Sequence, residues 1–224
     1  KAGAEAANYP FCTIEPNVGV VDVPDHRLNV LSDMVKARRI VPAAMRFVDI
    51  AGLVKGASKG EGLGNKFLAH IREVDAVAQV VRCFEDGNIT HVEGSIDPLR
   101  DIEIINTELC LADMESVEKR MERLTKILKT GDKKAVLEKA CMEKVLEGLG
   151  DAIPARRLGL TDDEKEFLKE LHLLTMKPVL YITNVAESEV ADPSGNVHVQ
   201  AVTKYAAEEG AEVEIIFANQ AKTI

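Results

Sequence analysis

The pattern of apolar and polar residues along the chain predicts an α/β fold. Four short apolar runs rich in β-branched residues are typical of buried strands; they span 45–50, 76–83, 179–183 and 212–217. Residues 18–23 alternate between apolar and polar positions, as an edge strand does. Helical patterns over 63–74 and 197–209 each precede a strand. Strands that alternate with helices form right-handed βαβ units, so we predict a mostly parallel sheet.

One long helical segment interrupts this alternation. Residues 98–128 carry apolar side chains mostly three and four positions apart, which predicts a single amphipathic helix. Gly131 and its neighbours offer a turn, and a second apolar stripe follows it: Val136, Ala140, Cys141, Val145 and Leu149. The two helices predict an antiparallel hairpin. The hairpin is interpreted either as a lid over the sheet or as a projecting arm for a partner, and the sequence leaves both open.

A further helix returns the chain to the sheet. Thr161 precedes the acidic residues 162–164, which is typical of an N-cap and the first turn of a helix. We expect this helix to run to about Leu174, because Pro178 stops helical structure shortly afterwards.

Composition excludes several classes of protein. The chain has 224 residues, 46% of them hydrophobic, and a formal net charge of -9, so no overall attraction to nucleic acid follows, although a sum hides any local basic patch. Its four cysteines are far apart, which favours a reducing, cytoplasmic setting. The apolar runs are too short to span a membrane, and the absence of Trp argues against a dedicated binder of single-stranded nucleic acid.

The first candidate site lies at the end of the apolar run 45–50. Asp49 would stand at the carboxyl end of a strand, where open α/β sheets bind ligands and where a carboxylate can hold Mg²⁺. Gly52 follows, and its amide can approach a γ-phosphate closely because it has no side chain. The alternative is that Asp49 only caps a turn. Residues 52–65 contain five glycines, which indicates a loop that orders with ligand, as opposed to an ordinary surface loop.

The second candidate site follows the run 179–183, where a buried strand delivers Asn184 and Glu187 toward a bound base. In GTP-binding proteins the matching element reads Asn-Lys-x-Asp, whose acid accepts hydrogen bonds from guanine. Here Val185 replaces the lysine and Glu187 the aspartate, so guanine should be discriminated poorly. A simple turn at the end of the strand is the alternative.

A third segment, 8–17, combines two prolines with Thr13 before the predicted edge strand. The threonine hydroxyl can join a Mg²⁺ shell, although loop threonines more often bond only to the local backbone.

Taken together, these motifs resemble the YchF family of Obg-like ATPases. The resemblance rests on Asn-Tyr-Pro-Phe-Cys-Thr-Ile-Glu-Pro-Asn at 8–17, Asp-Ile-Ala-Gly-Leu and the glycine-rich residues after it at 49–65, and Asn-Val-Ala-Glu at 184–187. It covers roughly residues 1–209, and Asp-Ile-Ala-Gly-Leu is its most specific part. Residues 82–86 and 101–109 resemble the same family.

The resemblance implies a Ras-like P-loop NTPase fold interrupted by a helical hairpin, Mg²⁺-dependent ATP hydrolysis and association with ribosomes. Thr13 and Asp49 would serve the metal, and Gly52 the γ-phosphate. Leu53 occupies the place of the water-orienting glutamine of Ras-like proteins, so His91 becomes a catalytic candidate, with an exposed loop histidine as the alternative. The residues implied for nucleotide binding are Phe84, Asn184, Val185, Glu187 and Ala218.

Two departures from the family qualify this picture. Its Gly-x-x-x-x-Gly-Lys-Ser loop should precede the first residue, yet residues 1–7 contain nothing like it, so we expect a truncated or incompletely represented protein. We likewise expect the family's C-terminal TGS domain to be absent. The predicted domains are 1–97, the first part of the nucleotide-binding domain; 98–160, the hairpin; and 161–224, the second part.

The sequence thus predicts a ribosome-associated, cytoplasmic ATPase that uses Mg²⁺ and binds GTP more weakly, with no membrane partner and no sequence-specific DNA binding. An Obg-type GTPase is the near alternative. A non-catalytic module that docks a macromolecule through its hairpin is the alternative from a different class.

Overall fold

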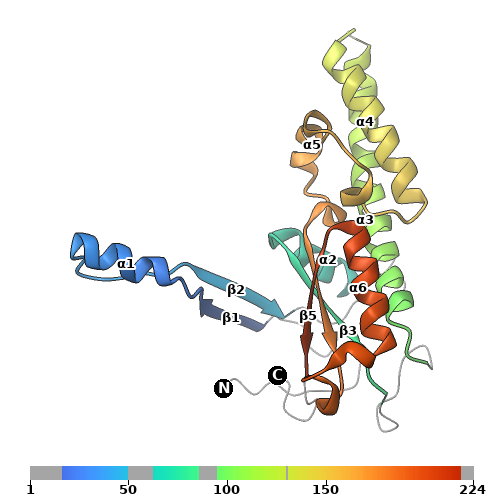
Figure 1. Cartoon of the computed structure of the whole chain (residues 1–224). Helices are drawn as coiled ribbons and strands as arrows, with labels where there is room; N and C mark the ends of the chain where they lie inside the picture. The colour runs from blue at the N-terminus through green and yellow to red at the C-terminus, as the bar shows by residue number, and fades with distance from the viewer. Residues whose placement is uncertain (1–16, 50–62, 86–94, 130, 218–224) are drawn as a thin grey trace. The chain divides into compact units, whose positions relative to one another are not determined.

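The computed structural model describes residues 17–49, 63–85, 95–129 and 131–217. By its internal contacts the chain divides into two compact units. The smaller comprises residues 9–52, and the larger comprises residues 1–8 and 53–224. Each is considered by itself (Figure 1).

The smaller unit is a two-stranded antiparallel sheet with a helix between its strands. β1 (Asn17–Asp22) pairs with β2 (Ala44–Asp49) in a register that sets Val20 opposite Arg46. α1 (His26–Val35) connects them, and it begins at Asp25, whose carboxylate accepts from the Arg27 amide over 3.0 Å. This helix was not anticipated from the sequence.

The strand predicted at 45–50 is present as β2, but the prediction that it is buried is wrong in the described structure. Met45 and Phe47 are each 50% exposed, because among the described residues β2 pairs only with β1. The prediction that 18–23 forms an edge strand is confirmed by β1, whose other edge has no described strand beside it.

The larger unit contains the predicted parallel sheet. β3 (Val77–Arg82), β4 (Val179–Asn184) and β5 (Glu212–Ile216) are hydrogen-bonded in the order β3-β4-β5, all parallel. α2 (Leu63–Glu73) precedes β3, and α6 (Val197–Glu209) lies between β4 and β5. α6 ends at Gly210, whose φ of 68° lies in the left-handed region that glycine adopts without strain.

One face of this sheet is covered by α6 and the first part of α3, which lie side by side in Figure 1. Their shared core is apolar, and its members are Val81, Cys83, Ile102, Tyr181, Val185, Val199, Val202 and Ala206. This core fixes the carboxyl ends of β3 and β4, because Cys83 and Val185 belong to it and directly follow those strands.

The helical hairpin is present as predicted. α3 (Pro98–Leu128) and α4 (Lys133–Gly150) pack along each other, and Asp97 and Asp132 cap their N-termini. The predicted stripe of α3 is largely correct, since Ile102, Leu109 and Val117 are buried. On α4 the predicted Cys141, Val145 and Leu149 are buried, whereas Val136 and Ala140 are exposed; Ala135 and Met142 are buried in addition.

The helix after the hairpin is shorter than expected. α5 (Asp162–Leu168) begins with the predicted Thr161 cap, whose hydroxyl accepts from the Glu164 amide while the Glu164 carboxylate accepts from the Thr161 amide. It passes into the 3₁₀ turn η3 (Lys169–Leu171) and stops at His172, which adopts a left-handed φ of 47°. A second 3₁₀ turn, η4 (Leu174–Met176), leads into β4.

Two further 3₁₀ turns lie between β4 and α6, η5 (Glu187–Glu189) and η6 (Pro193–Gly195), and η2 (Ala155–Arg157) follows α4. Within the described residues, no helix has the length and apolar character needed to cross a bilayer.

Candidate functional site

Four of the predicted site residues meet at the carboxyl edge of the parallel sheet. Phe84 follows β3, Asn184 ends β4, and Val185 and Glu187 come directly afterwards. Because β3 and β4 are neighbouring parallel strands, with Arg82 opposite Asn184 in register, their ends lie side by side. This is the edge at which open α/β sheets bind ligands.

The described structure does not place the other predicted residues relative to this edge. Asp49 ends β2 in the smaller unit, opposite Asn17. Thr13, Gly52, His91 and Ala218 lie outside the described residues, as do most of segments 8–17 and 52–65. Their assigned roles remain predictions.

Asn184 and Val185 are held firmly by the sheet. The carbonyl of Asn184 accepts from the Cys83 amide over 2.8 Å, and the Val185 amide donates to the carbonyl of Ile216 over 2.9 Å. Both residues are buried, Val185 to 1% exposure. The strand ladder therefore continues on both sides past the formal end of β4, which fixes the backbone from which Glu187 departs.

Glu187 opens the 3₁₀ turn η5 and is exposed. The turn is closed by Glu189, whose carboxylate accepts from the Ala186 amide over 3.3 Å while its own amide donates to the carbonyl of Ala186. Glu187 thus stands on a tethered turn with its carboxylate accessible to solvent. A carboxylate in this position accepts hydrogen bonds and cannot donate them.

Phe84 is half-buried beside the same edge. The guanidinium carbon of Arg82 lies 4.8 Å from the centre of its ring, and Arg82 Nε donates to the Phe84 carbonyl over 3.1 Å. The cation above the ring restrains the aromatic side chain. A planar apolar group therefore follows the end of β3, two residues after Arg82, which lies opposite Asn184.

Asn196 is a site residue that the sequence interpretation did not identify. Its Nδ2 donates to the Cys83 carbonyl over 2.8 Å and to Glu189 Oε2 over 3.2 Å, while its Oδ1 accepts from the amides of His198 and Val199 at the start of α6. One side chain, 8% exposed, joins the end of β3, the η5 turn and α6. The signal was present, because an Asn after a Pro-Ser-Gly turn and before a helix is typical of an N-cap.

The thiol next to this bracket is chemically quiet. Burial, with smaller contributions from Glu189 and Asp101, raises the pKa of Cys83 to about 12. Because the thiolate is the reactive form, Cys83 serves packing and not nucleophilic chemistry at neutral pH.

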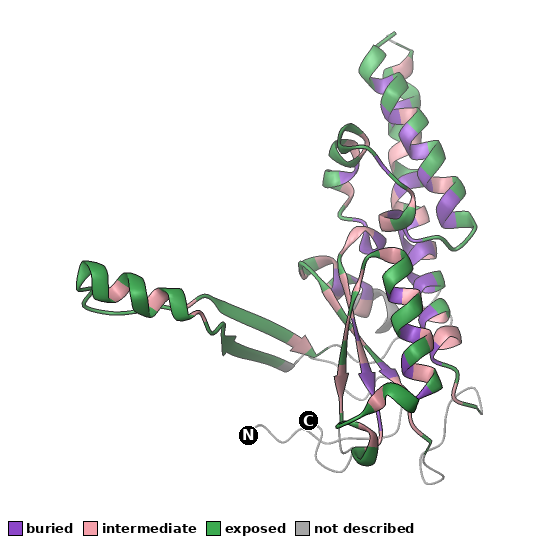
Figure 2. Ribbon diagram, viewed as in Figure 1, coloured by how far each residue is buried: buried purple, intermediate pink, exposed green. Residues whose placement is uncertain are grey.

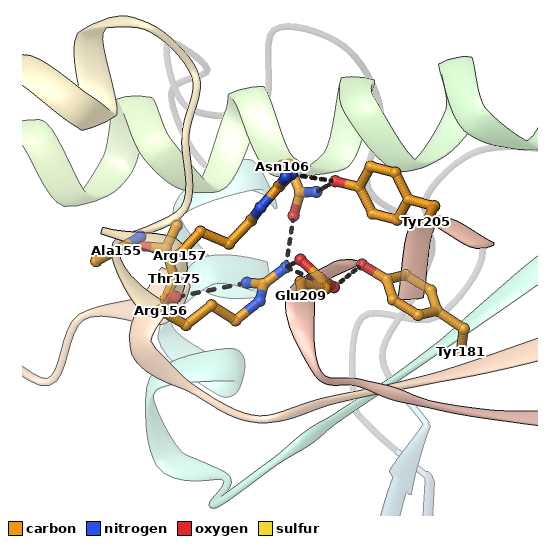
Figure 3. Close-up of polar contacts among 8 residues, drawn as sticks. All are labelled: Asn106, Ala155, Arg156, Arg157, Thr175, Tyr181, Tyr205 and Glu209. Atoms are coloured by element: carbon orange, nitrogen blue, oxygen red, sulfur yellow. Dashed lines mark hydrogen bonds and ion pairs between the residues drawn. The ribbon is translucent and has the colours of Figure 1, made fainter. Parts of the chain in front are cut away.

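A buried polar network around the C-terminal end of α6 joins this helix to β4 and to the base of the helical hairpin (Figure 3). The guanidinium of Arg156, in η2, donates to Glu209 over 3.2 Å and to Asn106 of α3 over 3.2 Å. Glu209 also accepts from the Tyr181 hydroxyl over 2.5 Å. The Glu209 side chain is fully buried. Burial and the neighbouring Glu209 carboxylate raise the pKa of Tyr181, so its hydroxyl stays a donor.

A second buried junction holds the segment that returns from the hairpin. Asp113 of α3 accepts from the amides of Leu174 and Thr175 over 2.9 and 2.8 Å and from the Thr175 hydroxyl over 2.7 Å. The same hydroxyl accepts from the Ala155 amide over 3.1 Å. Burial raises the pKa of Asp113, although these donors oppose the shift. Through Asp113 and the Thr175 hydroxyl, this junction holds Ala155, Leu174 and Thr175 at one point of α3.

The described residues contain no group of three or more His, Cys, Asp or Glu placed to hold a metal ion. Asp49 nevertheless offers an exposed carboxylate at a strand end, and Mg²⁺ in nucleotide sites commonly takes only one or two protein oxygens besides phosphate and water. The donor chemistry of Asp49 therefore fits this ion.

Comparison with known proteins agrees with this arrangement. A family model described as "50S ribosome-binding GTPase" matches residues 1–137. The chain is 58% identical over 218 residues to the protein named "Ribosome-binding ATPase YchF" of Bacillus subtilis (strain 168), covering 97% of this chain and 60% of that protein. It is 56% identical over 213 residues to the protein of the same name from Haemophilus influenzae, covering 95% of this chain and 58% of that protein.

A solved structure, described as the Schizosaccharomyces pombe YchF GTPase, matches with a TM-score of 0.72 at 41% identity. The match covers 94% of this chain and 58% of that one. The chain therefore spans about 60% of the length of the relatives it matches.

Proposed function

The chain belongs to the 50S ribosome-binding GTPase family, in its YchF branch of Obg-like P-loop NTPases, and on that premise we propose that it forms the base-binding part of a ribosome-associated ATPase. The observation that carries this proposal is the placement of Asn184, Val185, Glu187 and Phe84 around one edge of a parallel sheet. Relatives bear the name "Ribosome-binding ATPase", which supports the same function.

The residues at this edge favour adenine over guanine. The aspartate of guanine-binding proteins accepts from two guanine donors at once. Glu187 is longer by one methylene and starts from a fixed turn, so its carboxylate is displaced from that position. Val185 is 1% exposed, so the apolar core takes up the position at which guanine-binding proteins carry a lysine. GTP is therefore the weaker ligand.

The nucleotide would be held from several sides. Phe84 and the main chain of Ala218 would contact the base beside Asn184, and Gly52 would approach the γ-phosphate. Thr13 and Asp49 would hold Mg²⁺ through their oxygens, and the ion when bound offsets negative charge on the phosphates.

The same proposal assigns hydrolysis to His91, because Leu53 has no group that can orient water. Intrinsic turnover should consequently be slow. We expect the protein in the cytoplasm, because ribosomes work there.

The proposed domain division follows from this function. Residues 1–97 and 161–224 form two parts of the nucleotide-binding domain, and residues 98–160 form the helical hairpin as an arm for the macromolecular partner. The buried links from Arg156 to Glu209 and from Asp113 to Thr175 support an arm that is rigidly joined to the sheet. A chain that only docks a partner through this arm, without nucleotide, is the competing function.

Titration of Mg²⁺-ATP and Mg²⁺-GTP by calorimetry tests the proposal on two proteins, the chain as given and the chain extended upstream with a strand and a Gly-x-x-x-x-Gly-Lys-Ser loop. Binding of ATP in preference to GTP by the extended chain supports the ATPase. If neither protein binds either nucleotide, the docking module is the correct function.

A further inference from the structure

The carboxylate of Glu189 joins two of the loops that leave the carboxyl edge of the parallel sheet. Its Oε2 accepts from the Ala186 amide over 3.3 Å and from Asn196 Nδ2 over 3.2 Å. The same Nδ2 donates to the Cys83 carbonyl over 2.8 Å. A chain of three hydrogen bonds therefore crosses from the η5 turn after β4, through the start of α6, to the residue that directly follows β3.

This chain of bonds connects the bases of two candidate contacts to the nucleotide. Phe84 directly follows Cys83, and Glu187 directly follows Ala186. Figure 1 shows α6 running back along the sheet, so its first turn lies at the carboxyl edge. In Figure 2 the buried colouring at the end of β4 gives way to exposed colouring on the turns beyond it. The half-buried Glu189 thus lies between the buried edge and the exposed part of the turn that carries Glu187.

Charge pairing does not account for the position of Glu189. Within the described part of the chain, no lysine, arginine or histidine forms an ion pair with it. Its carboxylate accepts instead from uncharged donors that belong to the loops at the edge of the sheet. The geometry that it imposes on the η5 turn is therefore the better explanation. Three shielded glutamates elsewhere in the larger unit do face cations: Glu138 faces Arg120, Glu164 faces Lys144, and Glu209 faces Arg156.

The bonds to Glu189 restrict where the Glu187 carboxylate can go. The Glu189 amide donates to the Ala186 carbonyl over 2.9 Å, and the Glu189 carboxylate accepts from the Ala186 amide, so the turn is closed twice. Glu187 lies inside this closed turn, and its side chain starts from a fixed backbone. The turn can therefore hold the Glu187 carboxylate away from the place at which it would accept from guanine. Rigidity of this kind selects against the wrong base.

We propose that Glu189 is a positioning residue for base selection. Through Ala186 and Asn196 it holds the η5 turn in the conformation that keeps Glu187 from accepting the hydrogen bonds of guanine, and ATP is preferred as a result. The proposal rests on the proposed ATPase function and names a residue that sets the specificity of the same site. Glu189 acts through Glu187 and does not itself contact the base.

The test is calorimetric measurement of the dissociation constants of Mg²⁺-ATP and Mg²⁺-GTP for the chain extended upstream with a phosphate loop. Glu189→Ala removes the acceptor of both bonds. Glu189→Gln keeps a side chain of the same length, and because both bonds end on Oε2, its one amide oxygen can accept them. The matched control is Glu164→Ala, because the Glu164 carboxylate closes the first turn of α5 in the same way, by accepting from the Thr161 amide over 2.7 Å.

Glu189→Ala should reduce the preference for ATP over GTP by about tenfold, because the freed turn lets Glu187 reach guanine and has to be ordered again when ATP binds. Glu189→Gln should keep most of the preference. Glu164→Ala should keep all of it, although urea unfolding should show that both alanine variants are less stable than the unaltered protein. In a Glu187→Ala background, Glu189→Ala should leave the ratio of dissociation constants unchanged, since no carboxylate remains to be positioned.

An unchanged ratio in Glu189→Ala overturns the proposal, as does a loss of preference that Glu164→Ala shares, that Glu189→Gln shows in full, or that persists without the Glu187 carboxylate. These results leave the proposed function standing, because the unaltered protein still prefers ATP in each of them. An unaltered protein that binds neither nucleotide, or that prefers GTP, contradicts the proposed function and overturns this inference with it.

Discussion

The side-chain amide of Asn196 donates to the main-chain carbonyl oxygen of Cys83 over 2.8 Å, across 113 positions of sequence. Through this bond the first turn of α6 holds the end of β3 next to the end of β4. The candidate base-binding residue Phe84 directly follows Cys83, and Asn184 accepts from the Cys83 amide across the strand pair.

Replacing Asn196 by Ala should lower the free energy of unfolding by about 2–3 kcal/mol, because it removes the cap of α6 and the donor to Cys83 together. Urea unfolding measures the change. Asn196→Asp is the informative companion, since Asp caps a helix equally well but lacks the donor and sets a second carboxylate beside Glu189. If Asn196→Asp is as stable as the unaltered chain, the bond to Cys83 contributes nothing.

The buried ion pair between Arg156 and Glu209 should be sensitive to the loss of one partner. Arg156→Ala leaves the fully buried Glu209 side chain without its cation, and we expect a loss of about 3–5 kcal/mol in unfolding experiments. Replacing both residues by Met should cost less than the sum of the single changes. Lys165→Ala breaks the exposed pair with Asp162 and should cause no measurable change. Additive losses at Arg156 and Glu209 would contradict the pairing.

Asp113 should make stability depend on pH. Burial raises the pKa of its carboxyl above the ordinary value of 3.8, so the folded chain holds this proton more tightly than the unfolded chain does. The stabilising contribution is complete below that value and is lost as pH rises through the folded pKa. The stability of the unaltered chain relative to Asp113→Asn should therefore fall on raising the pH from about 4 toward neutral. A difference that stays constant or grows with pH would refute the shift.

The three described cysteines should be unreactive while the chain is folded. Burial raises the pKa of Cys83 and of Cys110 to about 12 and that of Cys141 to about 11. A Cys12→Ser background removes the remaining thiol. Titration with a disulfide reagent at neutral pH should then detect almost no thiol until denaturant is added. Rapid stoichiometric labelling of the native chain is the opposite result.

The sequence allowed the larger unit to be anticipated well, because its elements follow simple periods. The apolar steps of α3 and the β-branched runs of β3, β4 and β5 are properties of each segment alone. Asn184, Val185 and Glu187 could be placed for the same reason, since they directly follow one of those runs.

The wrong and the missing predictions also have physical causes. The buried strand expected at 45–50 rests on Met45 and Phe47, yet burial depends on what covers a strand, which its own residues do not specify. α5 is shorter than predicted because it passes into η3, which ends at His172. His172 adopts a left-handed conformation, and a histidine gives no sequence signal for such a turn. Asn196 and Arg156 escaped notice because their partners lie in distant segments, at Cys83 and Glu209.

The base preference at Glu187 is the most direct test of the account. Glu187 is exposed, so Glu187→Asp leaves the fold intact, and Glu208→Asp on α6 is a control of equal chemistry. The measurement is the ratio of ATP to GTP dissociation constants for the chain extended with an upstream phosphate loop. We predict that ATP binds more tightly than GTP. Glu187→Asp should shift the ratio toward GTP by about tenfold, which corresponds to one hydrogen bond to a charged group. Glu208→Asp should leave the ratio unchanged. A ratio that favours GTP at the outset, or one that Glu187→Asp does not move, would contradict base recognition at this edge of the sheet.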